Sequence, residues 1–341
     1  LLKEQLGERL NTILYPRSHH VWYAPINYRD KAFLENIGLS HIHALPNAVT
    51  AHPSSQDSVY TEKKETKTIL YPARAIRRKN IGEFLLWSLL SPKNYTFQST
   101  LAPQNETWKG CYNEWVTFAE ELNLPVEFDV GRKYDFGDLV RNADALISTS
   151  IAEGFGLAFL EPWLENKLLI GRKLPEITTD FEKEGIDLST LYTSLPVPIE
   201  WVGEDQFSSA LESAIHSTYD AYSKPWKSLY LQEAKQALIK DGKVDFGILN
   251  EELQRKVIRL IAEHPRKRKN LPEWVLPDNP ELIKNNRKVI NKQYSIETYG
   301  ELLLTIYQKL KSTEPNTITS ADAPALLEQF LQPQRFNLLR A

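Results

Sequence analysis

The sequence predicts an α/β protein built on a Rossmann-like parallel sheet with helices on both faces. From Thr66 onward, short apolar runs alternate with helical patterns, and each run is continuous rather than alternating between apolar and polar residues. Continuous apolar strands are typical of parallel sheets, because helices cover both faces of such a sheet. In this class of fold, ligands bind at the carboxyl ends of the strands. The loops that follow the strands are therefore the candidate site.

The composition restricts the classes of function. The chain has 341 residues, of which 42% are hydrophobic and 25% charged, and this length suits about two domains. The sequence has no apolar run near the ~20 residues needed to span a bilayer and no recognisable secretory signal, so we expect a cytoplasmic protein. A formal net charge of −3 argues against nucleic acid as the main partner. The single cysteine, Cys111, excludes an internal disulfide framework and a cysteine-rich metal site.

The N-terminal part contains one clear amphipathic helix. Its pattern runs from Asn27 to Leu39 and places Phe33, Leu34 and Ile37 on one face. Four histidines nearby allow a zinc site as a minor alternative: His19, His20, His41 and His43. Both pairs lie in or beside strand-like segments rather than on a helix or hairpin suited to zinc, so we expect polar surface positions. A polar linker is expected from His52 to Glu65.

The first strand of the sheet is predicted from Thr66 to Ala73, and a basic loop, RAIRRK, follows it. Asn80 is the candidate N-cap of the next helix, with Glu83 three positions later as a capping box. Arg74 and Lys79 bracket the loop just before this helix start, where their charges and the helix dipole can converge on a diphosphate. The alternative is a solvated basic turn formed by all four cationic residues: Arg74, Arg77, Arg78 and Lys79.

Further apolar runs and helical patterns extend the α/β alternation. The additional strands are predicted over these ranges: Thr96–Ala102, Pro125–Gly131, Leu168–Arg172 and Val197–Gly203. A helix is predicted from Asn113 to Leu122, and the region 206–263 is dominated by helical patterns, most clearly at its end. The basic cluster from His264 to Asn270 is interpreted as a solvated turn rather than a nucleic-acid patch. Toward the C-terminus, Ser295 caps a helix predicted from Tyr294 to Leu310, and a short amphipathic helix follows it.

The stretch from Ala145 to Ile170 carries the candidate site. An apolar run ends at Ser150, a loop holds Glu153, Gly154 and Gly156, and a helical pattern begins at Leu157 and places Glu161 in its second turn. Glycines allow phosphates to approach the backbone, and the N–H groups of a helix start favour negative charge. Carboxylates accept hydrogen bonds from hydroxyl pairs, which sugars and riboses offer. The pattern predicts a site for a phosphorylated sugar compound.

Four motifs in this order resemble a known family. The segment IAEGFGLAFLE resembles the Glu-x7-Glu motif of retaining glycosyltransferases with the B-type double Rossmann fold, especially family 4. LPNAV at Leu45–Val49 resembles the family's interdomain motif, and ARAIRRKN at Ala73–Asn80 resembles its basic loop, whose arginine and lysine are five apart like Arg74 and Lys79. LPEI at Leu174–Ile177 completes the set.

The resemblance implies a retaining hexosyltransferase that uses a nucleoside-diphosphate sugar as donor and needs neither metal nor cofactor. Arg74, Lys79 and Glu153 would be the catalytic residues, the first two neutralising the leaving diphosphate. Donor binding would involve these residues: Gly154, Phe155, Gly156, Leu157 and Glu161. Glu153 would contact the donor sugar and Glu161 the ribose. The family's base-binding loop corresponds to Arg132, Lys133 and Tyr134. The sequence does not identify the acceptor, whether sugar, glycan or small molecule.

The resemblance also implies a division of the chain. Residues 1–50 correspond to a remnant of the N-terminal acceptor domain and hinge, 51–290 to the nucleotide-sugar domain with helical additions, and 291–341 to a crossing helix and tail. Most of the family's N-terminal domain is therefore expected to be missing from this sequence. Three alternatives remain: a non-catalytic sugar-nucleotide-binding subunit that acts with a partner chain, a glycoside hydrolase with two acidic groups, and a nucleotide-sugar epimerase.

Overall fold

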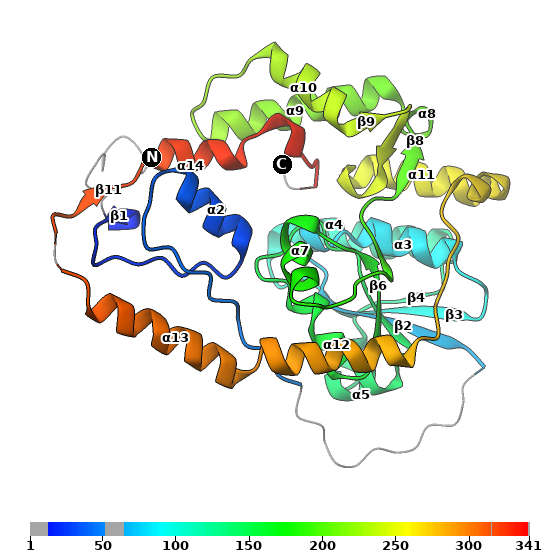
Figure 1. Ribbon diagram of the computed structural model, residues 1–341. Helices are drawn as coiled ribbons and strands as arrows, with labels where there is room; N and C mark the ends of the chain where they lie inside the picture. The colour runs from blue at the N-terminus through cyan, green and yellow to red at the C-terminus, as the bar shows by residue number, and fades with distance from the viewer. Residues whose placement is uncertain (1–12, 52–64, 315, 340–341) are drawn as a thin grey trace.

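Six parallel strands form the central sheet in the order β4-β3-β2-β5-β6-β7 (Figure 1). The computed structural model describes residues 13–51, 65–314 and 316–339. The strands of this sheet are β2 (Lys67–Arg74), β3 (Tyr95–Leu101), β4 (Val126–Glu127), β5 (Ala145–Ser148), β6 (Leu168–Arg172) and β7 (Leu191–Tyr192). The chain moves outward from β2 to β4 on one side and from β5 to β7 on the other, so the order reverses between β2 and β5. This is the strand order of a doubly wound Rossmann sheet, and it confirms the predicted fold class.

Helices cover both faces of the sheet. They are α3 (Ile81–Leu90), α4 (Glu106–Glu121), α5 (Phe136–Asn142), α6 (Glu161–Leu164), α7 (Pro175–Lys183) and α12 (Pro280–Gln293). Figure 1 shows α3 and α4 on one side of the sheet, and α5 and α12 on the other. The strands β5 and β6 are buried at every position, and the middle of β2 is buried as well, because helices cover both faces of the sheet. The strand β3 differs from the prediction, because its residues alternate between buried and half-buried positions before Ser99.

Two predicted strands differ from the structure. The strand predicted over Pro125–Gly131 is only two residues long, because Asp129 adopts a left-handed conformation (φ 60°) and a short 3₁₀ helix, η2 (Val130–Arg132), begins after it. The run Val197–Gly203 alternates apolar and polar residues like a strand, but the chain turns after β8 (Pro196–Pro198) into α8 (Ile199–Val202). Burial of Trp201 within α8 outweighs the local strand pattern.

A helical layer with a small sheet follows the main sheet. β8 pairs antiparallel with β10 (Lys243–Asp245), which also pairs with β9 (Ile239–Lys240). The helices of this layer are α9 (Glu204–Ala221), α10 (Ser228–Leu238) and α11 (Glu251–Glu263). The basic cluster itself forms a 3₁₀ helix, η5 (Pro265–Asn270). The clear helical pattern at the end of region 206–263 is confirmed as α11, capped by the side chain of Asn250.

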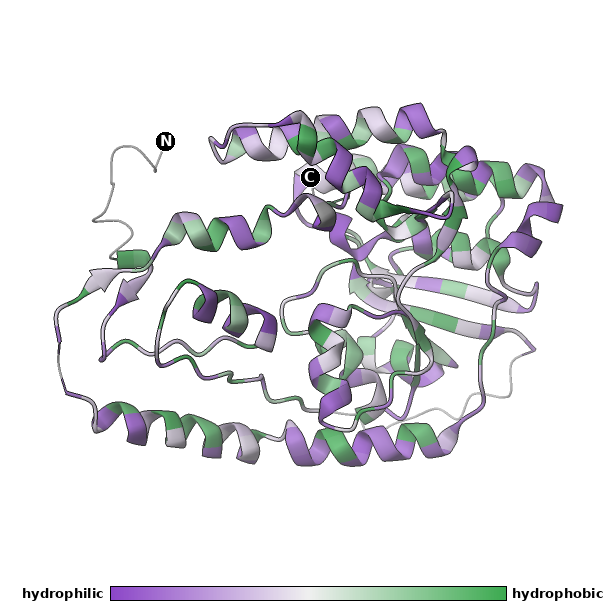
Figure 2. Cartoon of the chain, turned by 45° about the horizontal axis from the view of Figure 1, so that its top comes forward, coloured by the Kyte–Doolittle hydropathy of each residue, from purple (hydrophilic) through white to green (hydrophobic). Residues whose placement is uncertain are grey.

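The N-terminal segment lies between α13 and α14 in Figure 1. Its helix α2 (Tyr28–Asn36) starts where predicted, because the Asn27 side chain accepts the Asp30 N–H. Ser295 caps α13 (Ile296–Lys311) as predicted. Apolar residues occur along α13 (Figure 2), and Leu304 and Tyr307 among them are exposed. The predicted linker His52–Glu65 lies outside the described residues except for its last position.

The C-terminal strap, residues 319–339, joins the N-terminal segment to the sheet domain. It contains β11 (Thr319–Ser320), which pairs with β1 (Pro16–Arg17), then α14 (Ala323–Phe330) and the 3₁₀ helix η6 (Pro333–Arg335). The ring of Phe330 packs edge-on against Phe33 of α2, with 4.9 Å between centroids. Farther along the strap, Leu338 donates its N–H to the Ile248 carbonyl at 2.9 Å. The strap therefore holds the N-terminal segment against the rest of the chain.

Candidate functional site

The loops that follow β2 and β5 lie side by side where the strand order reverses. The Ile151 N–H donates to the Arg78 carbonyl at 3.0 Å. The hydroxyls of Tyr71 and Thr149 donate to the Lys79 carbonyl at 2.7 and 3.0 Å, and that of Thr149 also contacts the Asn80 carbonyl at 3.1 Å. These bonds hold the basic loop and the glutamate loop in one fixed arrangement. Ligands of doubly wound sheets bind in the crevice at this position.

Three charged residues meet in that crevice, and we call them the switch-point cluster: Arg78, Lys79 and Glu153. The Lys79 ammonium forms an ion pair with one oxygen of the Glu153 carboxylate. The Arg78 guanidinium donates to the other oxygen at 2.8 Å and to the Ala152 carbonyl at 2.8 Å. The Glu153 side chain is 9% exposed, whereas that of Arg78 is 41% exposed. One side of the cluster is therefore open to an incoming ligand.

The environment keeps the Glu153 carboxylate ionised. Burial alone would raise the pKa of Glu153, but the Lys79 charge and hydrogen bonds from Lys79, Arg78 and Ser150 outweigh it and hold the pKa below its ordinary value. Two cations thus surround one anion. A ligand phosphate could bind the same two cations, because guanidinium and ammonium groups donate to phosphate as they do to carboxylate.

The spacing argument paired Arg74 with Lys79 as diphosphate contacts, and this stays a prediction. The structure adds Arg78, which lies beside Lys79 at the Glu153 carboxylate. Arg74 is the last residue of β2, and its guanidinium donates to the Ala102 carbonyl at 3.1 Å. The next three cations form a single 3₁₀ turn, η1 (Arg77–Lys79). Because a 3₁₀ helix has three residues per turn, three successive side chains point in three different directions. Arg77 pairs with Glu251 at 2.7 Å, while Arg78 and Lys79 reach Glu153. The alternative of a solvated basic turn is therefore wrong for Arg77 and Lys79.

The capping box predicted at Asn80 does not form. Asn80 does precede α3, but it has φ +55° and its side chain caps no backbone N–H. Its amide donates to the Glu83 carboxylate at 3.0 Å instead, and its oxygen accepts from Gln254 at 2.8 Å. The first turn of α3 is buried, with Ile81 only 6% exposed. The side chains of Asn80 and Glu83 therefore bond each other rather than the first backbone N–H groups of α3.

The helix predicted to begin at Leu157 is also wrong. A 3₁₀ turn, η3 (Leu157–Phe159), comes first, and Glu161 is the first residue of the four-residue α6 rather than a second-turn residue. Gly156 has φ +96°, and a Cβ there would lie 2.9 Å from the Phe159 ring, so this turn requires glycine. Pro162 fits the helix start without bending it. So short a helix has little dipole, and anion binding by the backbone N–H groups of this loop stays a prediction.

The rest of the glycine loop is anchored from several sides. Phe155 is 6% exposed and packs against Phe181 and Tyr294, so its backbone rather than its side chain could meet a donor. The Gly154 carbonyl accepts from the Asn27 amide at 3.0 Å, which ties the loop to the N-terminal segment. Leu157 is 39% exposed. The donor-binding roles of these backbone groups and of Glu161 remain predictions.

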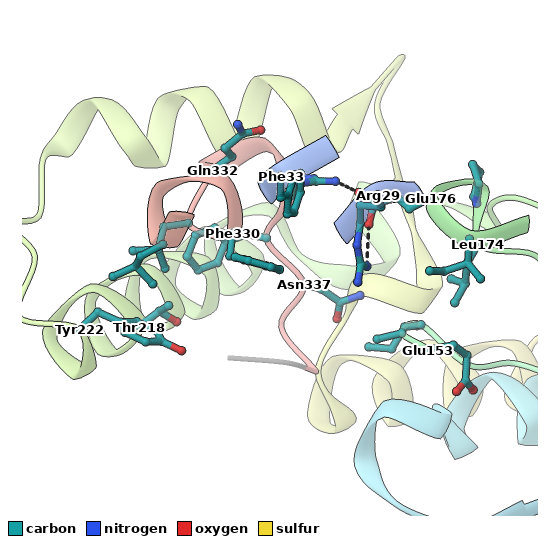
Figure 3. Close-up of a pocket in the computed structure, with 18 of the residues that line it drawn as sticks. Arg29, Phe33, Glu153, Leu174, Glu176, Thr218, Tyr222, Phe330, Gln332 and Asn337 are labelled. Carbon is teal, nitrogen blue, oxygen red and sulfur yellow. Dashed lines mark hydrogen bonds and ion pairs between the residues drawn. The ribbon is translucent and has the colours of Figure 1, made fainter. Parts of the chain in front are cut away.

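A cavity of about 660 Å³ adjoins the switch-point cluster (Figure 3). Its walls come from α2, residues 151–153, the start of α7, the end of α9 and the C-terminal strap. Glu153 is the single predicted site residue among those that line it. In Figure 3 the Glu153 carboxylate points away from Arg29 and Glu176. The cavity therefore begins beside Glu153 and extends toward the N-terminal segment and the strap, a feature that sequence patterns could not reveal because its walls come from distant segments.

Other candidates from the sequence lie outside this cavity, and the base contact proposed for residues 132–134 stays a prediction. Arg132 pairs with Asp129 at 2.6 Å and is 73% exposed, and neither it nor Lys133 and Tyr134 line the cavity. His41 and His43 stack on Trp22. Among the residues that the structure describes, no group of three or more possible metal ligands occurs.

Burial first, and then the neighbouring Glu251, raises the pKa of the Cys111 thiol to about 12.

Within the described ranges, every helix is too short or too polar to cross a membrane.

Comparison with known proteins yields one curated relative. No protein-family model matches the chain. The mannosylglucosyl-3-phosphoglycerate synthase of Petrotoga mobilis is 27% identical over 330 residues, which cover 89% of this chain and 63% of the relative. The chain thus spans less than two thirds of that relative's length.

Solved structures resemble the chain more distantly. The crystal structure of TarM gives a TM-score of 0.48 at 12% identity, covering 84% of this chain and 43% of TarM. A sucrose-phosphate synthase from Thermosynechococcus elongatus gives 0.46 at 14% identity, covering 85% of this chain and 58% of that one.

Proposed function

We propose that the chain is a glycosyltransferase that moves a hexosyl group from a nucleoside-diphosphate sugar to an acceptor hydroxyl, with retention of anomeric configuration. The observation that carries this proposal is the switch-point cluster, where Arg78 and Lys79 surround Glu153 at the carboxyl ends of β2 and β5. A crevice at this position is where such sheets bind nucleotides. The name of the Petrotoga relative, a synthase of a phosphorylated glycoside, supports the same class of reaction.

In this proposal Lys79 and Arg78 bind the donor's diphosphate. The reaction breaks the bond between the sugar's anomeric carbon and the diphosphate, so negative charge grows on the leaving group and fixed cations stabilise it. When the diphosphate binds, it accepts the hydrogen bonds that Arg78 and Lys79 otherwise donate to Glu153. The Glu153 carboxylate then becomes available to the sugar hydroxyls. Arg74 would add a third cation if its guanidinium left the Ala102 carbonyl.

Glu153 and Glu161 would act on different parts of the donor. Glu153 lines the cavity and lies beside the cations, which suits contact with the sugar. Glu161 begins α6, after the glycine loop, and would accept hydrogen bonds from the ribose hydroxyls. The side-chain cations would supply the charge that a divalent ion supplies elsewhere, so the proposed reaction is independent of metal.

The test is calorimetric titration with UDP-, GDP- and ADP-sugars, followed by a transfer assay with the donor that binds best. We expect one donor to bind, and transfer to continue in excess EDTA. The anomeric configuration of the product, measured by NMR coupling constants, tests retention. Absence of binding for every donor would contradict the proposed function. Binding without transfer to any acceptor would indicate a sugar-nucleotide-binding subunit, and rescue of transfer by magnesium or manganese would contradict metal independence.

A further inference from the structure

The cavity has two ends of different chemistry. One end is lined by Glu153, whose carboxylate pairs with the two cations of the switch-point cluster. The other end combines aromatic rings, Phe33, Phe330 and Tyr222, with two arginines, Arg29 and Arg335. If the donor binds at the first end, the second end is left for the acceptor.

The two arginines come from segments that are far apart in the sequence and share one carboxylate. Arg29 lies on α2, and its guanidinium is 3.4 Å from the Glu176 carboxylate. Arg335 lies on the C-terminal strap, forms an ion pair with the same carboxylate and stacks over the Phe33 ring at 5.3 Å. Figure 3 shows Glu176 beside Arg29 at the wall of the cavity. Arg29 is also held by Asp30 at 2.8 Å.

Glu176 occupies the position that a ligand anion would take. Its side chain is 45% exposed, more than Arg29 at 21% and Arg335 at 30%, so it can turn toward solvent while the arginines stay in place. Surface ion pairs of this exposure are weak, because water screens them. Guanidinium groups bind carboxylate and phosphate in similar geometry. A phosphate or carboxylate on a ligand can therefore replace Glu176 between the two arginines.

We infer that this end of the cavity binds an anionic acceptor, a glycoside that carries a phosphate or carboxylate group. Arg29 and Arg335 bind the anion, and the rings of Phe33 and Phe330 pack against the sugar. The C-terminal strap supplies seven of the residues that line the cavity, Arg335 among them, so the strap builds a large part of this acceptor wall. The inference rests on the proposed function, since it assigns the acceptor to the site whose other end takes the donor.

The test compares two probes that differ in charge. The 341-residue chain is titrated with glucosyl-3-phosphoglycerate and with glucosylglycerol, which carries the same sugar without the phosphate and carboxylate. We expect the charged probe to bind about tenfold more tightly or better. Arg29→Gln and Arg335→Gln should each lose about tenfold of the affinity for the charged probe and leave that for the neutral probe within about twofold.

Glu176→Gln gives an opposite and more specific result. This variant removes the competing carboxylate, so the charged probe should bind more tightly than to the wild type. A purely structural role of the three residues would not produce gain in one variant and loss in the other two. Arg259→Gln is the matched control: Arg259 pairs with Glu121 at 3.0 Å and lies over the Phe118 ring at 5.2 Å, but it does not line the cavity.

The inference is overturned if the charged probe binds no more tightly than the neutral one, or if Arg29→Gln and Arg335→Gln retain wild-type affinity. An equal loss in Arg259→Gln would also overturn it. Binding of a nucleoside diphosphate is measured with the same wild-type and variant proteins. This measurement distinguishes failure of the acceptor inference from failure of the proposed function. If the protein binds a donor but binds both probes equally, the anionic acceptor is rejected and the proposed function is not. If the wild type binds no donor, the proposed glycosyltransferase function is rejected.

Discussion

Two clusters of three charged side chains in this molecule differ in their surroundings. In the switch-point cluster, two cations surround Glu153, and Arg78 is 41% exposed. In the second, which we call the buried ion cluster, Arg172 joins Glu83 and Asp245, and the side chains of Arg172 and Glu83 are 5% and 0% exposed.

Their hydrogen bonds explain the difference. In the buried ion cluster, Arg172 contacts both carboxylates at 2.7 Å, and Tyr192 donates to Glu83 at 2.6 Å. Burial raises the pKa of the Glu83 carboxyl, while the Arg172 charge outweighs burial at Asp245 and lowers its pKa. This cluster ties α3 and β10 to the end of β6, and none of its three residues lines the cavity. Buried charges stabilise the fold, whereas a partly exposed cation such as Arg78 can exchange its carboxylate partner for a ligand.

Arg172→Leu should have the largest effect on stability. It leaves the buried Glu83 carboxylate and the partly buried Asp245 carboxylate without their cation, which costs about 3 to 5 kcal/mol in the free energy of unfolding. Urea denaturation followed by circular dichroism measures this change. Arg259→Leu, which disrupts an exposed pair, is the control and should cost less than about 1 kcal/mol. Similar losses in both variants would erase the distinction between the two clusters.

Lys79→Ala and Arg78→Ala should affect ligand binding far more than stability. Each charge-assisted contact to a phosphate contributes roughly 1.5 to 3 kcal/mol, so affinity for a nucleoside diphosphate should fall about tenfold to a hundredfold. Calorimetry with the preferred diphosphate measures it. Arg255→Ala is the control, since Arg255 pairs with Glu114 at 2.9 Å away from the crevice. Wild-type affinity in both cluster variants would remove the phosphate site from the switch point.

Glu153→Gln and Glu161→Gln should separate turnover from donor binding. Glu153 is proposed to contact the sugar, whose charge changes during the reaction, so Glu153→Gln should mainly lower kcat. Glu161 is proposed to hold the ribose equally in ground and transition states, so Glu161→Gln should mainly raise the donor KM. Steady-state kinetics decides between them. Unchanged constants in both variants would favour a purely structural role for the motif.

The smallest expected effect is a pH dependence of stability at Glu153. Its folded-state pKa lies below the ordinary value, so the ionised carboxylate stabilises the fold fully above the unfolded-state pKa of about 4.3. This contribution is lost as the pH falls through the lower folded-state pKa. The stability difference between wild type and Glu153→Gln should therefore be constant above about pH 5 and shrink in more acidic solution. A difference that grows on acidification would contradict the pairing.

The sequence alone determined the class of fold and the loops that carry the site. Continuous apolar runs such as β2 and β6 predict a parallel sheet, because a strand buried on both faces needs no polar alternation. Local patterns located two helices as well: the apolar periodicity predicted α2, and Ser295 predicted the start of α13. The Ser295 side chain bonds an N–H group three residues later, which is a short-range interaction. Lys79 and Glu153 could be singled out because both follow strands.

Tertiary structure alone decided which side chains meet. Arg78 and Lys79 meet Glu153 because β2 ends at Arg74 and one 3₁₀ turn then orients the next three cations. Glu83 becomes part of the buried ion cluster instead of a capping box because Arg172, 89 positions later, reaches it. The cavity brings Arg29 and Arg335 to one carboxylate across most of the chain. Local patterns encode elements through short-range bonds, whereas ion pairs and cavities depend on how distant elements pack.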